Sequence, residues 1–184
     1  MKKLLLITGD LATGKSTFAH ILSQRYDTCL IVKDTVKEVL GDVLGASSNE
    51  ESKRLSIAAV EVMFYTFSAF ESLNKDLILE ANFHAEELVK IHEMAAKSGY
   101  EVLTLVIRAN PEILHKRYLN RMKNENRHPV HLSAMFEAFD DFKAYIDRSR
   151  AEKILGKAID INADDFSYQT DKAILAQIDD FMKA

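Results

Sequence analysis

The chain has 184 residues, of which 47% are hydrophobic and 28% are charged, and its formal net charge is −4. This length favours a single domain spanning residues 1–184, with a core that needs no disulfide or metal to hold it. The acidic balance argues against a general nucleic-acid-binding surface. The single cysteine, Cys29, excludes an intrachain disulfide and favours a cytoplasmic location.

The amino terminus does not resemble a secretory signal. Lys2 and Lys3 precede an apolar run that already ends at Ile7, which is too short for the apolar region of a signal peptide. The most apolar longer segment, residues 55–70, contains Glu61 and predicts a buried helix, not a membrane span. We therefore expect no membrane partner.

Short apolar runs alternate with amphipathic segments along the chain. The predicted strands are residues 4–8, 29–32, 77–79, 102–107 and 158–161. The predicted helices are residues 14–25, 34–40, about 50–74, 85–97, 111–123, 131–150 and 170–182. The long helix is expected to bury Leu55, Val62, Met63, Phe67 and Phe70. Continuously apolar strands between helices predict an α/β fold, with a five-stranded parallel sheet covered by helices on both faces.

Residues 9–16 read Gly-Asp-Leu-Ala-Thr-Gly-Lys-Ser, between the first predicted strand and the first predicted helix. This is the phosphate loop G-x-x-x-x-G-K-[ST]. Gly9 and Gly14 permit backbone conformations that turn successive N–H groups toward an anion. Lys15 would reach the β- and γ-phosphates, Ser16 would hold Mg²⁺, and Thr17 adds a second hydroxyl. The predicted nucleotide-binding residues are Gly9, Leu11, Ala12, Thr13, Gly14, Lys15, Ser16 and Thr17.

Ligands of parallel sheets bind beyond the carboxyl ends of the strands, so the residues that follow each strand are candidates for the site. They are Lys33-Asp34, Glu80-Ala81-Asn82, Arg108 and Asn162, in addition to the phosphate loop. Asp34 follows the second strand and could accept the proton of an attacking hydroxyl, as the general base of a kinase does. Alternatively, it could cap the helix that follows.

Glu80 ends the third predicted strand, where a carboxylate could contact Mg²⁺ or its water ligands. The alternatives are a helix-start carboxylate or a substrate contact without metal. Asn82 would point to the same side as Glu80 if the strand continued, and could bind substrate or serve as a cap or turn residue.

Residues 115–131 form the basic part of this acidic chain, with a formal balance of +4. Arg117 and Arg121 are four residues apart and share a helix face. Arg127 lies in a polar stretch between two helices, as in a lid that closes over ATP. We rank Arg127, then Arg121, then Arg117 as candidates for stabilising the transferred phosphoryl group, with Arg117 also binding the nucleotide. The alternative is a solvated basic surface.

Two histidines of this segment, His128 and His131, are three residues apart, but no carboxylate or cysteine at a suitable spacing completes a metal site. No zinc is predicted.

These motifs resemble the compact P-loop kinases, an AAA_33-like group that includes chloramphenicol phosphotransferase, the zeta toxins and the polynucleotide kinase domain. The resemblance covers nearly the whole chain and rests on residues 9–17, 32–34, 79–82 and 117–127. It implies a three-layer fold with a helical lid at about residues 115–131, MgATP as donor, and an acceptor hydroxyl deprotonated by Asp34. The chain lacks the lid pattern Arg-x-x-Gly-Arg and has Glu where Asp is usual after the third strand.

Three functions follow from this resemblance and its alternatives. The first is an ATP-dependent kinase acting on a small-molecule or nucleoside-like hydroxyl, the second a polynucleotide 5′-hydroxyl kinase, and the third a nucleotide-dependent switch or binding module that is not a kinase. Residues 74–77, Asn-Lys-Asp-Leu, approach the guanine-binding element Asn-Lys-x-Asp, but the Asp comes one position early. Residues 42–45 have the spacing of a switch motif but follow a helix. We interpret both as coincidences.

Overall fold

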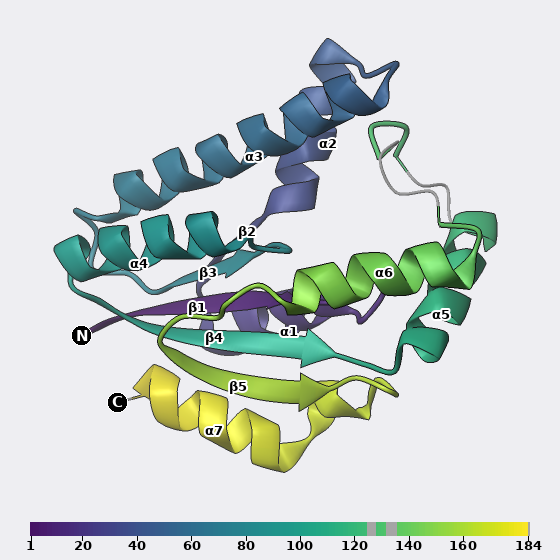
Figure 1. Ribbon diagram of the computed structural model, residues 1–184. Coiled ribbons are helices and arrows are strands. Elements are labelled where there is room, and N and C mark those ends of the chain that lie inside the picture. The colour runs from purple at the N-terminus through teal and green to yellow at the C-terminus, as the bar shows by residue number, and fades with distance from the viewer. Residues whose placement is uncertain (125–127, 132–135, 184) are drawn as a thin grey trace.

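Five parallel strands form one sheet in the order β2-β3-β1-β4-β5 (Figure 1). The computed structural model describes residues 1–124, 128–131 and 136–183. The strands are β1 (Lys2–Gly9), β2 (Cys29–Val32), β3 (Leu77–Glu80), β4 (Tyr100–Arg108) and β5 (Lys157–Asn162). All five lie where the apolar runs predict them, so the predicted α/β fold is confirmed.

The helices agree with those predicted from the sequence, except for the helix that follows the basic segment. They are α1 (Lys15–Tyr26), α2 (Lys33–Leu44), α3 (Asn49–Phe70), α4 (Ala85–Ser98), α5 (Pro111–Asn124), α6 (Phe139–Arg150) and α7 (Lys172–Lys183), with the 3-10 turn η1 (Ser167–Thr170) before α7. The prediction of a helix from residue 131 is wrong, because α6 begins at Phe139. Asp140 and Asp141 mark that start, since carboxylates favour the first turn of a helix. None of the described helices has both the length and the apolar character to cross a membrane.

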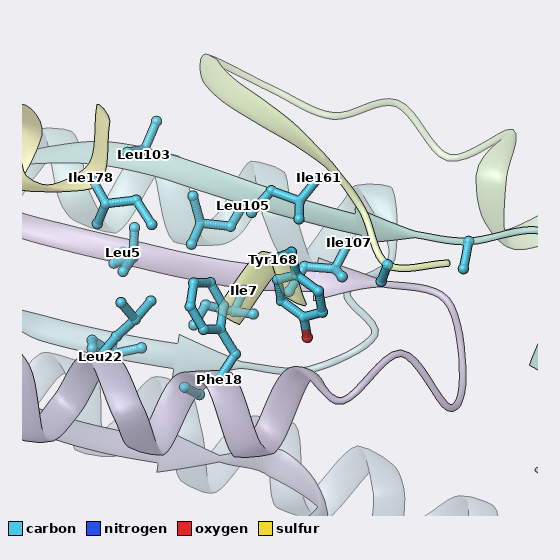
Figure 2. Close-up of a cluster of buried hydrophobic side chains, with 14 of the residues drawn as sticks. Leu5, Ile7, Phe18, Leu22, Leu103, Leu105, Ile107, Ile161, Tyr168 and Ile178 are labelled. Carbon is cyan, nitrogen blue, oxygen red and sulfur yellow. The ribbon is translucent and has the colours of Figure 1, made fainter. Parts of the chain in front are cut away.

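Successive β1 side chains point to opposite faces of the sheet and build two cores. Leu4 and Leu6 pack with side chains of α3 and α4 on one face. Leu5 and Ile7 pack with side chains of α1 and α7 on the other. Figure 2 shows this second core, in which Phe18 and Tyr168 meet edge to face with ring centroids 5.2 Å apart. The sheet is thus enclosed between two helical layers, as its apolar strands predict.

One expected core residue of α3 is exposed. Val62 was predicted to be buried, but 39% of its surface is accessible. Leu55, Met63 and Phe67 are buried as predicted, and the buried positions 60, 63, 64 and 67 follow the i, i+3, i+4, i+7 spacing of a single helix face. Val62 lies outside that face, and Phe64 is buried in its place.

The register brings the ends of three strands together. Glu80, the last residue of β3, pairs with Ile7 of β1 and with Val32 of β2. The phosphate loop follows β1, Lys33 and Asp34 follow β2, and Glu80 is the last residue of β3. The candidate groups therefore converge at one edge of the sheet.

Candidate active site

The loop between β1 and α1 has the backbone of an anion-binding nest. Gly9, Ala12 and Gly14 have positive φ angles of 128°, 59° and 86°. Ala12 is notable because residues with a side chain seldom adopt this region, and such strain clusters at ligand sites. Gly14 immediately precedes α1, so the loop leads into a helix amino terminus, where N–H groups and the helix dipole favour an anion.

Lys15 is buried at the start of α1, with 8% of its surface accessible. Its Nζ donates a hydrogen bond of 2.5 Å to the carbonyl oxygen of Asp10 in the same loop. Burial lowers the pKa of this ammonium group, although the charges of Glu80, Asp10 and Asp34 oppose the shift. The loop therefore places a poorly hydrated amine beside its own N–H groups, where an anionic ligand would find a partner.

Ser16 and Glu80 meet across the gap between α1 and β3. The Ser16 hydroxyl donates a hydrogen bond of 2.8 Å to Oε2 of Glu80. Burial raises the pKa of Glu80, although Lys15 and the Ser16 hydroxyl favour its ionised form. The alternative that Glu80 starts a helix is wrong, since it ends β3 and α4 begins only at Ala85.

Substitution of Glu80 by glutamine is expected to stabilise the protein near neutral pH. A carboxyl group whose pKa is raised on folding contributes stability below its unfolded pKa and loses that contribution as pH rises through the folded value. In thermal unfolding from about pH 4 to about pH 8, the melting temperature of E80Q should therefore rise relative to that of the wild type as pH increases. The exposed Glu93→Gln is the control and should show no such trend. A lower melting temperature for E80Q across this range would contradict the prediction.

Asp34 occupies the first turn of α2 but does not cap it. The N-cap residue is Val32, so the capping alternative is wrong. The Lys33 ammonium lies 2.8 Å from Oδ1 of Asp34. Burial acts to raise the pKa of Asp34, but the charge and hydrogen bond of Lys33, with help from His131 and Lys15, outweigh it and lower the pKa. The carboxylate therefore stays ionised near neutral pH and can accept a proton.

A cavity of about 640 Å³ connects these groups. Its lining is Leu11, Ala12, Thr13, Gly14, Lys15, Ser16, Thr17, Lys33, Asp34, Glu80, Ala81, Asn82, Arg117, Asn120, Arg121, Phe166 and Gln169. Asn82 also shares a side-chain hydrogen bond with Tyr145 of α6. Of the described candidates, Gly9, Arg108 and Asn162 are not part of the lining. Gly9 lies beneath the loop, against the backbone of Ile107.

The predicted arginines have different surroundings. Arg117 donates hydrogen bonds of 2.7 Å to the carbonyl oxygens of Ala163 and Asp164, and its guanidinium lies 4.2 Å from the ring centroid of Phe166. Arg121 is exposed at the cavity, and its charge reaches Lys15, whose pKa it helps to lower. Arg127 lies outside the described residues.

Residues 128–131 contact α2, and this contact accounts for His128 and His131, the two histidines considered as a metal pair. His128 Nε2 lies 3.0 Å from Oδ1 of Asp42, and His131 Nε2 lies 2.8 Å from Oε1 of Glu38. Between them, Val130 packs so closely on Gly41 that a Cβ there would lie 2.8 Å from Val130 Cγ2. The histidines thus pair with separate carboxylates of α2 in the described part of the chain.

Several residues of the site were missed by sequence reasoning. Phe166 and Gln169 follow β5. Ligands bind beyond the carboxyl ends of the strands, so this segment was a candidate region, but nothing in the sequence singled out these two residues. Tyr145 and Arg150 lie on α6, and no local motif distinguishes them. Arg108 and Asn162, predicted for the ligand crevice, line a separate cavity of about 510 Å³ instead.

The two motifs that suggested a switch protein lie away from the phosphate cavity. Asp76 precedes β3 and accepts a hydrogen bond of 2.7 Å from the backbone N–H of Lys3, at the amino ends of the strands. Asp42 lies in α2 and contacts His128. Neither carboxylate is among the residues that line the cavity, which supports coincidence.

Comparisons with known proteins agree with this geometry. The model of the AAA_33 family, described as an AAA domain, matches residues 4–148. A candidate kinase from Chloroflexus aurantiacus is 25% identical, with a TM-score of 0.85 and 98% of each chain covered. Shikimate kinase from Bacteroides thetaiotaomicron is 13% identical, with a TM-score of 0.63 and 99% of each chain covered. A sugar kinase from Janibacter sp. HTCC2649 is 10% identical, with a TM-score of 0.61, over 100% of this chain and 95% of that one. None of the curated proteins compared with the chain matches it.

Proposed function

This chain belongs to the AAA_33 family of AAA domains, and we propose that it is an ATP-dependent kinase that transfers the γ-phosphoryl group of MgATP to a hydroxyl group of a small molecule. The observation that carries this proposal is the cavity that both the phosphate loop and Asp34 line. Transfer to a hydroxyl needs a held phosphoryl donor and a nearby proton acceptor. The similarity to kinase structures supports the same class of reaction.

In the proposed reaction, the acceptor oxygen forms a bond to the γ-phosphorus while the bond from that phosphorus to the β,γ-bridging oxygen breaks. The acceptor proton passes to the Asp34 carboxylate, and ADP leaves with the bridging oxygen. The ammonium of Lys15 and the guanidinium of Arg121 stabilise the negative charge on the phosphoryl oxygens. Loop N–H groups hold the remaining phosphates in line.

The donor set formed by Ser16 and Glu80 fits Mg²⁺, because a hydroxyl and a carboxylate oxygen already meet within 2.8 Å. Mg²⁺ typically takes few protein ligands and fills its other positions with phosphate oxygens and water. When bound, it would neutralise charge on the phosphates. Ser16 and Glu80 are the residues that would hold it.

Phe166 and Arg117 are proposed to receive the nucleotide base. Phe166 is 49% exposed and lines the cavity beside Gly14, where a Cβ would lie 2.9 Å from its Cε1 atom. The guanidinium of Arg117 lies over the same ring. An aromatic face and a planar cation at one end of a phosphate cavity provide stacking surfaces for a purine.

Replacing Lys33 by glutamine is expected to move the acidic limb of the rate profile to higher pH. Lys33 supplies both the largest charge effect and the hydrogen bond that lower the Asp34 pKa. Without them the pKa rises, and the base becomes protonated at a pH where the wild type is still active. The measurement is kcat/KM against pH for both proteins, and an unchanged limb would contradict Asp34 as the titrating group.

The proposal is tested with purified protein, MgATP and a panel of acceptors. The panel contains nucleosides, sugars, hydroxyl-bearing antibiotics and a 5′-hydroxyl oligonucleotide, and both ADP release and acceptor phosphorylation are measured. We expect ADP release that depends on one class of small acceptor. Phosphorylation of the oligonucleotide alone would favour a polynucleotide kinase, and acceptor-independent GTP hydrolysis would favour a switch. Calorimetry that detects no affinity for ATP or GTP would reject nucleotide chemistry altogether.

A further inference from the structure

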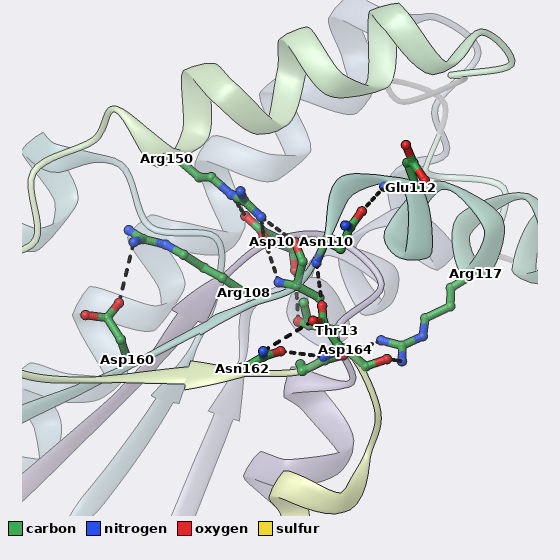
Figure 3. A network of polar contacts seen from close by, with 12 residues as sticks. Asp10, Thr13, Arg108, Asn110, Glu112, Arg117, Arg150, Asp160, Asn162 and Asp164 are labelled. Atoms are coloured by element: carbon green, nitrogen blue, oxygen red, sulfur yellow. Dashed lines mark hydrogen bonds and ion pairs between the residues drawn. The ribbon is translucent and has the colours of Figure 1, made fainter.

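An ion pair with a buried carboxylate and a partly exposed guanidinium connects the phosphate loop to α6. Asp10 is the second residue of the loop motif, and its side chain is 1% exposed. It accepts hydrogen bonds from Arg150 of 2.6 Å from Nη2 and 3.3 Å from Nε, and one of 3.3 Å from the backbone N–H of Ala109. Arg150 Nη2 also donates to the Ala109 carbonyl at 2.5 Å. Figure 3 shows this network, in which α6 reaches the loop and the end of β4 through one guanidinium.

The backbone of Asp10 also makes hydrogen bonds that shape the loop. Its N–H donates to the carbonyl of Ile107 at 2.9 Å. Its carbonyl accepts from the Thr13 hydroxyl at 3.0 Å and from the Lys15 ammonium at 2.5 Å. Whatever fixes Asp10 therefore fixes the starting positions of both a nest residue and the phosphate-binding lysine. Among the described side chains, Arg150 is the one that donates hydrogen bonds to the Asp10 carboxylate.

The charge of Asp10 is close enough to affect ligand binding. It raises the affinity of Lys15 for its proton, so its field extends to the amine meant for the phosphates. A carboxylate buried behind an anion site repels a polyphosphate through a medium that screens poorly, unless a cation neutralises it. The guanidinium of Arg150 is bonded to that carboxylate in a fork-like arrangement suited to this task.

We propose that Arg150 is a positioning residue for the phosphate loop, which neutralises Asp10 and holds it so that the loop and Lys15 accept a polyphosphate. This inference rests on the proposed function, because it presumes a nucleotide in the loop. It also gives α6 a second role. The helix contributes Tyr145 to the acceptor side through Asn82 and Arg150 to the donor side through Asp10, so one rigid element supports both halves of the site.

The test is a charge cycle with MgADP as the probe and isothermal calorimetry as the measurement. R150Q leaves the Asp10 carboxylate uncompensated and should weaken MgADP binding about tenfold or more. D10N removes the repelling charge and should bind within about threefold of the wild type. The double variant D10N/R150Q should recover to within about threefold of the wild type, and R150K, which keeps the charge without the fork, should lie between R150Q and the wild type.

A control separates positioning from stability. Arg25 and Asp179 form a similar forked pair, with hydrogen bonds of 2.7 and 3.0 Å, at the far end of α1. R25Q should lower the melting temperature and leave the MgADP affinity unchanged. If R150Q behaves in the same way, Arg150 is only structural and the inference is overturned.

The two proposals fail differently. A wild type that does not bind MgADP rejects the proposed function and this inference together. A wild type that binds while R150Q binds equally well rejects the inference alone. If R150Q does not fold, R150K and D10N/R150Q decide: reduced affinity in R150K together with retained affinity in the double variant supports the inference, and affinity lost in the double variant overturns it.

Discussion

Replacing Asp34 by asparagine is expected to lower kcat by about 10²–10⁴-fold, the usual contribution of a general base. Asparagine keeps the shape of the side chain but cannot take the proton of the acceptor hydroxyl. The phosphate loop lies on a different element from Asp34, so the affinity for MgATP should stay within about threefold of the wild-type value. Steady-state kinetics combined with calorimetry separates these two effects, because only kcat should fall.

The control is a carboxylate on the same helix that does not line the cavity. Asp42 lies on α2 with a side chain that is 72% exposed, and it contacts His128. Asp42→Asn should retain kcat within about twofold, since exposed pairs of this kind contribute little. Full turnover by D34N would show that another group takes the proton. Glu80 would then be the carboxylate to examine, because it lines the same cavity and its raised pKa suits proton transfer.

The sequence was sufficient for those parts of the site that local physics dictates. The strands β1, β2 and β3 each contain a continuous apolar run, and a parallel sheet requires all the strand carboxyl ends to share an edge. Knowing that Asp34 and Glu80 follow two such strands was therefore enough to expect them near the phosphate loop. The functional roles given to these residues stay predictions, because proximity alone does not establish chemistry.

What the sequence could not provide depends on contacts between distant segments. Arg150 and Asp10 are 140 positions apart, and no local pattern distinguishes Arg150 from Arg148 on the same helix. The expected helix from residue 131 failed for a related reason. Pro129 already disfavours a helix just before this point, and His131, where the helix was expected to begin, contacts Glu38 of α2 instead. Tertiary contacts of this kind override local propensity.

Gly9→Ala is expected to cost the largest amount of stability of any substitution considered, at least about 3 kcal/mol. Two effects combine. The φ angle of Gly9 is +128°, which a residue with a side chain rarely adopts, and an added Cβ would lie 2.0 Å from the carbonyl oxygen of Ile107. That oxygen accepts the N–H of Asp10, so relieving the clash would also move the residue that orients Thr13 and Lys15. Denaturant unfolding measures the loss of free energy, and calorimetry with MgADP should show weaker binding.

Gly99→Ala separates backbone strain from this clash. Gly99 has a φ of +72°, yet no heavy atom lies within 4 Å of its Cβ position. The substitution should therefore cost only about 1 kcal/mol, the penalty of the left-handed conformation. Equal losses in the two variants would contradict the contact with Ile107, whereas a G9A chain that cannot fold is the extreme form of the expected result. The glycine that starts the motif would then be required because β4 leaves no room for a side chain, before any phosphate is bound.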